Sequence, residues 1–234
     1  MSGTSLLMVR AIWRFLFYLI AFWYGIAVLW NKQYFWDTRH CWYGYPWQPI
    51  PDEIYWYYMI ELGFYWSLVL SLFMDVKRKD FVEMIIHHVA TIGLMCFSWA
   101  DGMVRIGTLV LVVHDAVDYW MEGAKLAKYL RYDKLCDVLF VIFASMWFIT
   151  RIVIYPVRLI SCTLNEGHHI VGWFPMYYGF NFLLLVLQAL DINWFIVIVR
   201  MAHVFITQGQ PNGKNGTQVS NNNQAMPTCQ ITKW

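Results

Sequence analysis

Residues 81–98 read FVEMIIHHVATIGLMCFS, a stretch that is almost wholly apolar and yet contains Glu83, His87 and His88. A helix that crosses a bilayer needs roughly 20 mostly apolar residues, because the hydrocarbon holds no water to satisfy open backbone groups. The stretch therefore predicts a membrane-spanning helix. Spacings of four place Glu83, His87 and Thr91 on one face of it, and His88 is turned away by about 100°. Ionisable residues are expensive to keep inside a membrane, so these side chains are functional candidates.

Five more apolar stretches of similar length occur in the chain, at residues 14–30, 54–74, 103–121, 135–155 and 176–198. Hydrophobic residues make up 59% of the 234-residue chain and charged residues only 14%, which does not suit a soluble surface. We therefore expect an all-α fold, a multi-pass transmembrane helical bundle of about six spans. The expected division of the chain is an N-terminal cytosolic segment, a transmembrane domain and a polar, disordered cytosolic tail, at residues 1–12, 13–207 and 208–234.

The overall charge and the cysteines exclude several functional classes. The chain has 17 Lys and Arg against 15 Asp and Glu, a net charge of +2, which leaves no basic surface for nucleic acid. Its five cysteines show no C-x-x-C spacing, which argues against a zinc site and against a disulfide framework. A pairing of Cys41 with Cys162 stays open if both face an oxidising lumen.

The distribution of basic residues predicts the orientation of the spans. Lys and Arg accumulate in cytosolic loops, and most of the 17 basic residues fall on one side of six alternating spans. This places both termini, residues 77–79 and residues 125–134 in the cytosol. The glycosylation sequon at Asn215 would then never meet the lumenal machinery, so we expect it to stay unmodified.

The predicted span at residues 103–121 and its C-terminal flank carry a second polar group, formed by His114, Asp115, Asp118 and Glu122. Counted from the expected cytosolic ends of the two spans, a rise of about 1.5 Å per residue puts His87 roughly 9 Å and Asp115 roughly 10 Å deep. A histidine and a carboxylate at matched depth on antiparallel helices form the pair that general-base or nucleophilic catalysis requires. Glu122 and Lys125 are expected at the solvated helix end.

Other interpretations of these residues stay open. Buried histidines can simply hydrogen-bond between helices, although six ionisable groups in two adjacent spans favour a site. Lys77, Arg78 and Lys79 are interpreted first as a topology signal, with contact to an anionic substrate as the alternative. Membrane di-iron enzymes gather many histidines in H-x-x-H-H-like boxes, and only three of the seven histidines here fall in the cluster, so no metal is expected.

The order of several short motifs is more specific than any one of them. The motifs are FWD (35–37), CW (41–42), YPWQP (45–49), ELGFYWSL (61–68), DVKRKDF (75–81), HH (87–88), RIGTL (105–109), HD (114–115), Asp118 and EGAK (122–125). In this order, from about Trp13 to the last span, the chain resembles the ceramide synthase family, whose catalytic unit is the membrane TLC domain. The resemblance assigns residues 13–207 to that domain and the protein to the endoplasmic reticulum membrane.

The resemblance implies an N-acylation, in which an acyl group moves from acyl-CoA to the amine of a sphingoid base (sphinganine or sphingosine) and gives dihydroceramide or ceramide. His87 would take the acyl group as an acyl-imidazole or act as general base, with His88 supporting it. Asp115 and Asp118 would orient the imidazole and accept the proton of the attacking ammonium. The implied substrate-binding residues are Lys77, Arg78 and Lys79, which would hold the phosphates of coenzyme A, together with Arg105, His114 and Glu122. Acyl-CoA is a co-substrate, and no cofactor is expected.

Several features depart from the family pattern. Val117 stands where a serine is common in the H-D-x-S-D run, and Leu72 stands where glutamine is frequent. The chain begins in the linker that follows the N-terminal helix and homeobox-like domain of many animal members, so we expect a short form without them. This favours the alternative of a catalytically impaired TLC-domain protein that binds lipid or regulates a full-length ceramide synthase, as a homo- or hetero-dimer. The loop around residues 160–166 matches the segment that biases acyl chain length in the family.

Overall fold

The computed structural model describes residues 3–74, 80–172 and 176–208, and every regular element in these ranges is helical. The long helices are α1 (Gly3–Leu29), α3 (Asp52–Met74), α4 (Phe81–Ala100), α5 (Val104–Tyr129), α6 (Asp133–Trp147) and α8 (Tyr177–Gln208). The shorter elements are α2 (Gln33–Trp36) and η1 (Thr38–Cys41) after α1, and η2 (Phe148–Ile160), η3 (Cys162–Gly167) and α7 (His168–Val171) after α6. The predicted all-α fold class is confirmed.

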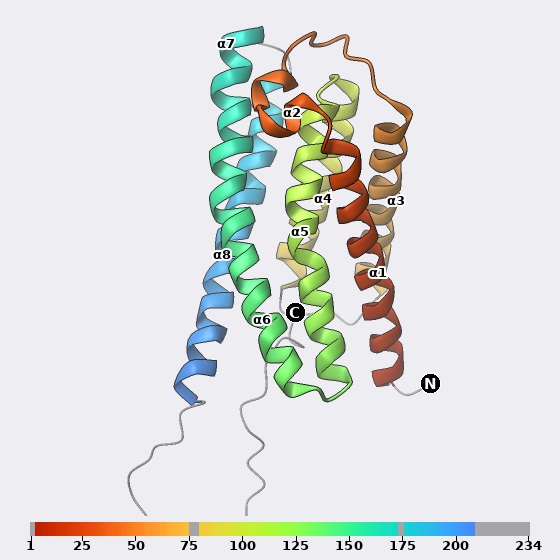
Figure 1. Ribbon diagram of the computed structural model, residues 1–234, viewed down its shortest axis with the longest axis vertical. Helices are drawn as coiled ribbons and strands as arrows, with labels where there is room; N and C mark the ends of the chain where they lie inside the picture. Colours follow the sequence, from red (N-terminus) through yellow and green to blue (C-terminus); the bar gives the residue numbers. More distant parts are fainter. Residues whose placement is uncertain (1–2, 75–79, 173–175, 209–234) are drawn as a thin grey trace, which may run out of the picture.

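Among the described residues, five helical segments are long and apolar enough to cross a membrane, namely Ser5–Leu29, Asp52–Met74, Phe81–Ala100, Asp133–Val171 and Tyr177–Val204. The sixth expected span corresponds to α5, which is as long as the others but carries too many charged side chains to face lipid. It lies inside the bundle instead, against α1, α4, α6 and η2 (Figure 1). The bundle is thus built around α5, and α1 begins at the end of the bundle where α8 finishes.

A tight turn at Asp101 and Gly102 makes α4 and α5 antiparallel neighbours. Gly102 has a φ of +74°, a left-handed conformation that favours glycine, and a Cβ there would lie 2.6 Å from the carbonyl oxygen of Pro46. At about 1.5 Å per residue, His87 lies roughly 20 Å from the end of α4 at this turn, and Asp118 roughly 21 Å from the start of α5. The turn therefore brings the polar groups of the two helices to one level.

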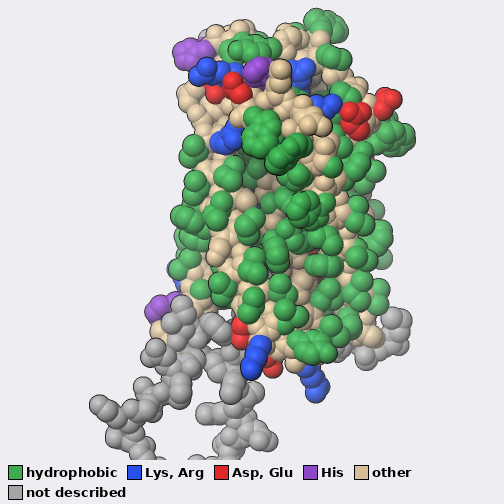
Figure 2. Space-filling model, in the orientation of Figure 1, with side chains coloured by type: hydrophobic (Ala, Val, Ile, Leu, Met, Phe, Trp, Pro, Cys, Tyr) green, Lys and Arg blue, Asp and Glu red, His purple; other side chains and the backbone are tan. Residues whose placement is uncertain are grey.

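The outer surface of the bundle suits a lipid environment. Apolar side chains cover the middle of the face shown in Figure 2, while charged side chains gather toward its two ends. Large apolar side chains that are each more than half exposed include Ile20, Leu70, Val157 and Phe182. A lipid phase can cover such surface without the cost that water would impose, so the protein is a multi-pass membrane protein.

The prediction of a loop at residues 160–166 is wrong. The helix that begins at Asp133 continues through η2 and η3, with the wider turns of a π-helix, as far as Val171. It ends at Gly172, whose φ of +82° is a conformation that favours glycine. The segment that resembles the chain-length region of the ceramide synthase family is therefore the last part of a long helix.

The expectation that Glu122 and Lys125 lie at a solvated helix end is also wrong. Both side chains are buried, and Lys125 Nζ donates to Glu122 Oε1 at 2.8 Å. They are enclosed because α5 continues to Tyr129 and α6 packs along it. Each charge inside the bundle is thus balanced by the other.

Candidate active site

His87 and His88 are neighbours on α4 whose rings contact different helices. Their ring centroids are 5.4 Å apart. His87 is half-buried, with its ring 5.2 Å from that of Trp194 on α8, whereas His88 is buried, with its ring 6.2 Å from that of Tyr65 on α3. The Nδ1 atom of each histidine is buried and has no hydrogen-bond partner among the described residues. Each imidazole thus keeps an open ring nitrogen, which a base or a nucleophile requires.

Asp115 is completely buried on α5 and faces α3. Its Oδ2 accepts a hydrogen bond from the hydroxyl of Tyr57 at 3.5 Å, while its Oδ1 has no partner in the described ranges. Glu61 lies one helical turn after Tyr57, is also completely buried, and its carboxyl group interacts with that of Asp115. Within the same ranges neither carboxyl oxygen of Glu61 has a hydrogen-bond partner. Two buried carboxyl groups beside each other repel when both are charged, so this pair is suited to share a proton.

Arg151 on η2 links α5 and α8 through a network of buried charges. Its Nη2 donates to Asp118 Oδ1 at 2.8 Å and to the carbonyl oxygen of His114 at 3.0 Å, and its Nη1 donates to Asp191 Oδ1 at 3.2 Å. The guanidinium also lies 4.2 Å from the centroid of the Trp147 ring, a cation–π contact. Arg151 is 3% exposed and Asp191 is 1% exposed, so the network is shielded from the surroundings of the bundle.

His114 belongs to this network rather than to the histidine pair on α4. Its Nδ1 donates to the carbonyl oxygen of Val110 at 2.8 Å, since a carbonyl oxygen can only accept. Its Nε2 then faces Asp191 Oδ2 at 3.4 Å, without the alignment of a hydrogen bond. The ring also meets the ring of Tyr155 edge-on at 4.9 Å. His114 is therefore fixed inside the bundle by contacts to three helical segments.

The structure brings the four predicted catalytic residues to one level without joining the histidines to the aspartates. In the part of the chain that is described, no hydrogen bond connects His87 or His88 with Asp115 or Asp118. Asp118 accepts a hydrogen bond from Arg151, and Asp115 faces α3. The expected direct pairing of a histidine with an aspartate is therefore not seen as a contact.

The predicted substrate-binding residues lie in different places. Arg105 lies at the other end of α5, where its guanidinium donates to two backbone carbonyl oxygens of the segment between α1 and α3, at 2.8 and 3.2 Å. Glu122 is engaged by Lys125, one turn beyond Asp118 on α5. Residues 77–79 lie outside the described residues. Arg105 thus anchors a connecting segment, and it is His114 and Glu122 that lie close along α5 to the predicted catalytic residues.

Glu61, Arg151 and Asp191 are site residues that the sequence interpretation misses. Each is one of at most two acidic or basic residues in a predicted span, at residues 54–74, 135–155 and 176–198. An ionisable side chain in an otherwise apolar span is itself the signal that marks a functional candidate. Counting basic residues for topology uses Arg151 only to assign a side of the membrane, whereas the structure buries it among carboxylates.

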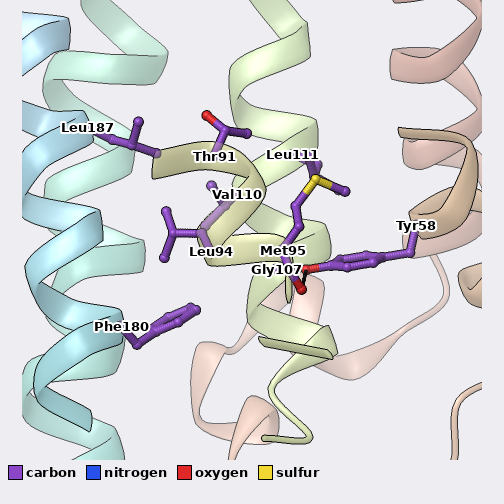
Figure 3. A pocket seen from close by; sticks show the side chains of 9 residues that line it. All are labelled: Tyr58, Thr91, Leu94, Met95, Gly107, Val110, Leu111, Phe180 and Leu187. Carbon is purple, nitrogen blue, oxygen red and sulfur yellow. Dashed lines mark hydrogen bonds between the residues drawn. The ribbon is translucent and has the colours of Figure 1, made fainter. Parts of the chain in front are cut away.

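A small apolar cavity of about 20 Å³ lies beside this site, between α3, α4, α5 and α8. Figure 3 shows Leu187 and Phe180 approaching it from α8 and Tyr58 from the opposite side. Thr91 also lines it, one turn beyond His87 on α4, and donates its hydroxyl to the carbonyl oxygen of His87 at 2.9 Å. The cavity starts one turn from the histidines and has apolar surroundings, and its size suits one small group.

Comparison with known proteins identifies the family of this bundle. The family model described as the TLC domain matches residues 8–200, most of the chain. The chain belongs to the TLC domain family. Human ceramide synthase 5 is 44% identical to this TLC-domain protein over 224 residues, which cover 96% of the chain and 57% of that relative.

Other ceramide synthases are similar to the same TLC domain. Human ceramide synthase 4 is 44% identical over 201 residues, which cover 86% of this chain and 51% of that protein. Ceramide synthase hyl-1 of Caenorhabditis elegans is 39% identical over 210 residues, which cover 85% of this chain and 57% of that protein. The chain spans about half the length of the curated relatives it matches. The resemblance to the ceramide synthase family that the motifs indicate is confirmed.

Proposed function

We propose that this TLC domain transfers a fatty acyl group from acyl-CoA to the amine of a sphingoid base, giving ceramide or dihydroceramide. The observation that carries the proposal is a pair of histidines with open ring nitrogens, level with a buried carboxyl pair, inside a bundle with an apolar exterior. Both substrates are lipids with one polar, reactive end, so they can lie along the bundle with that end at the level of the histidines. The names of the relatives, which are ceramide synthases, support the same reaction.

His87 is the proposed nucleophile, as the resemblance to the ceramide synthase family implies, and His88 supports it as a neighbouring ring 5.4 Å away. A ring nitrogen of His87 bonds to the carbonyl carbon of the thioester, the carbon–sulfur bond breaks, and coenzyme A leaves as a thiolate. The substrate amine then bonds to the same carbon, the bond to the imidazole breaks, and the amide is released. The alternative route has His87 act as a general base toward the ammonium group, without the covalent step. Neither route uses a metal or a further cofactor.

The proton of the attacking ammonium needs an acceptor at the level of the histidines. We assign this role to Asp115 together with Glu61, because their open carboxyl oxygens have no hydrogen-bond partner among the described residues. Asp118 accepts a hydrogen bond from Arg151 at 2.8 Å, so it already has a cationic partner. Its proposed role is to keep α5 in register with η2 and thereby to hold Asp115 at the level of the histidines.

The proposed location is the endoplasmic reticulum membrane, with both termini and residues 77–79 in the cytosol. His87 would then lie roughly 9 Å from the cytosolic start of α4, which acyl-CoA can reach, while the preceding basic residues would hold its phosphates. A glycosylation sequon inserted beside Trp47, which is 90% exposed between α1 and α3, should be modified, and Asn215 should not. Modification of Asn215 alone would overturn this orientation.

The activity is tested in microsomes from cells that lack ceramide synthase. The chain is expressed there, supplied with sphinganine and a panel of acyl-CoAs, and the ceramide formed is measured for each acyl length. His87→Ala should lower the initial rate of product formation by at least about a hundredfold. His169→Ala is the matched control, because His169 is exposed on α7 and lies far from the site along the bundle, and it should leave the product unchanged.

Each outcome of this assay bears on a different part of the proposal. A rate of product formation that stays unchanged in His87→Ala would refute the role of His87. No product from a correctly inserted wild-type chain would refute the enzyme proposal and favour a TLC-domain protein that binds lipid or regulates a ceramide synthase. Co-purification of a tagged full-length ceramide synthase would then test the homo- or hetero-dimer that this alternative requires.

A further inference from the structure

We propose that Cys41 and Cys162 form a disulfide bond that fastens the segment between α1 and α3 to η3. Cys41 is the last residue of η1, and Cys162 is the first residue of η3. The two side chains are 2% and 1% exposed, and their thiol groups interact with each other. Two cysteines that are far apart in the sequence are thus buried together at one end of the bundle.

Contacts on both sides of Cys41 fix the position of the Cys162 sulfur. The indole Nε1 of Trp42 donates to Cys162 Sγ at 3.2 Å, and the Cys162 thiol donates to the carbonyl oxygen of Thr38 at 3.5 Å. Thr38 begins the single helical turn that Cys41 ends, and Trp42 is the next residue. The sulfur of Cys162 therefore lies against the turn that carries Cys41 and interacts with the Cys41 thiol.

The two segments are also docked by contacts that do not involve sulfur. The hydroxyl of Thr38 donates to Glu166 Oε2 at 2.8 Å. Gly167 lies so close to the Trp42 ring that a Cβ there would be 2.5 Å from it. Arg105 of α5 holds the same connecting segment through its hydrogen bonds to backbone carbonyl oxygens. The cysteines therefore face each other in a packed environment and not across an open gap.

The burial of the pair indicates when the bond forms. Contact with the Cys162 thiol and burial raise the pKa of the Cys41 thiol, so the folded dithiol would react slowly. The bond therefore forms during folding, by exchange with the disulfide of a thiol oxidoreductase. The two thiols lose their protons and two electrons, one sulfur–sulfur bond forms, and the disulfide of the oxidoreductase is reduced to two thiols. This chemistry needs an oxidising compartment, so the inference rests on the proposed orientation and not on the proposed reaction.

The other described cysteines serve as internal controls. Cys96 is exposed on α4, and Cys136 is buried near the start of α6, which lies at the end of the bundle opposite to α7 (Figure 1). Neither of them lies beside η1 and η3. Both are expected to stay thiols when Cys41 and Cys162 are oxidised.

The test is differential alkylation of the wild-type chain, purified from membranes of eukaryotic cells. Thiols are blocked with N-ethylmaleimide under denaturing conditions, disulfides are then reduced, and the thiols so released take an isotopically heavy form of the reagent. Cys41 and Cys162 are expected to carry the heavy label, and Cys96 and Cys136 the light one. Light label on Cys41 and Cys162 would overturn the proposal.

The variant Cys41→Ser identifies the partner. It should move Cys162 from the heavy to the light label, and heavy label that persists on Cys162 would show a different partner and overturn the pairing. Reducing agent should also lower the apparent Tm of the wild-type chain but not that of the Cys41→Ser/Cys162→Ser variant, and equal responses would count against the bond. The acyltransfer assay is read separately, so an active enzyme without the disulfide refutes only this inference.

Discussion

Replacement of Arg151 by methionine tests whether the buried charge network holds the bundle together. Arg151 is 3% exposed and donates to Asp118 at 2.8 Å and to Asp191 at 3.2 Å. Methionine can fill much of the space beside Trp147, but it leaves both carboxylates without their cation. Removal of one partner of a buried ion pair costs about 3 to 5 kcal/mol, because the remaining charge stays where solvation is poor.

The measurement is thermal unfolding of the purified chain in detergent. A loss of about 3 to 5 kcal/mol corresponds to a fall in apparent Tm of roughly 6 to 20 °C for a domain of this size. Arg200→Met is the matched control, because Arg200 is exposed on α8, and it should change stability by about 0.5 kcal/mol or less. An Arg151→Met chain as stable as the control would refute the stabilising role of the network.

A second arm separates the loss of the ion pair from the loss of the side chain. Asp191→Asn removes the charge that Arg151 contacts at 3.2 Å, and Arg151→Met/Asp191→Asn removes both members of that pair. The double variant should lose less stability than the sum of the two single variants, because neither charge of the pair is then left alone. The recovery should be partial, since Asp118 still lacks its cation. Additive losses would show that Arg151 and Asp191 are not coupled.

Two further predictions concern the site and the packing at the end of the bundle. His87→Ala should lower the initial rate of acyltransfer by at least about a hundredfold, as expected for a lost catalytic base or nucleophile. His88→Ala should lower it less, and equal losses would contradict the division of roles. Gly167→Ala places a Cβ 2.5 Å from the Trp42 ring and should cost about 1 to 3 kcal/mol, seen as a lower apparent Tm. Gly63→Ala is the control, because a Cβ there meets no described atom within 4 Å, and an equal Tm for the two variants would exclude the close approach.

The membrane helices could be predicted because each apolar stretch is long enough to span a bilayer by itself. The expected span at residues 81–98 agrees with α4 (Phe81–Ala100), and that at residues 54–74 agrees with α3 (Asp52–Met74). The largest disagreement is the helix expected at residues 135–155, which continues to Val171. A second disagreement lies where the side chains become polar, since α5 runs on to Tyr129 beyond the expected end at residue 121. Polar residues limit the contact of a helix with lipid, but they do not end the helix when protein surrounds it.

The candidate site could be predicted in its residue types but not in its contacts. The common level of His87 and Asp115 follows from the helical rise and from the antiparallel arrangement of two consecutive spans. The partner of Arg151 does not follow from any spacing, because only the packed bundle brings η2 against α5 and α8. The burial of Glu122 could not be predicted for the same reason, since the sequence places it beyond the apolar stretch and the packing of α1 and α6 along α5 encloses it.

The helices packed against α5 give its two aspartates different contacts, although the aspartates lie one turn apart. Arg151 of η2 pairs with Asp118, with Nη2 2.8 Å from Oδ1, so protonation of Asp118 would break a buried ion pair. The carboxyl group of Glu61 on α3 interacts with that of Asp115, whose Oδ1 has no hydrogen-bond partner in the described ranges. Uptake of a proton there relieves the repulsion between two buried carboxyl groups instead of breaking a contact. In the proposed reaction, a proton released at the level of the histidines is therefore accepted by Asp115, while Asp118 keeps the helices in register.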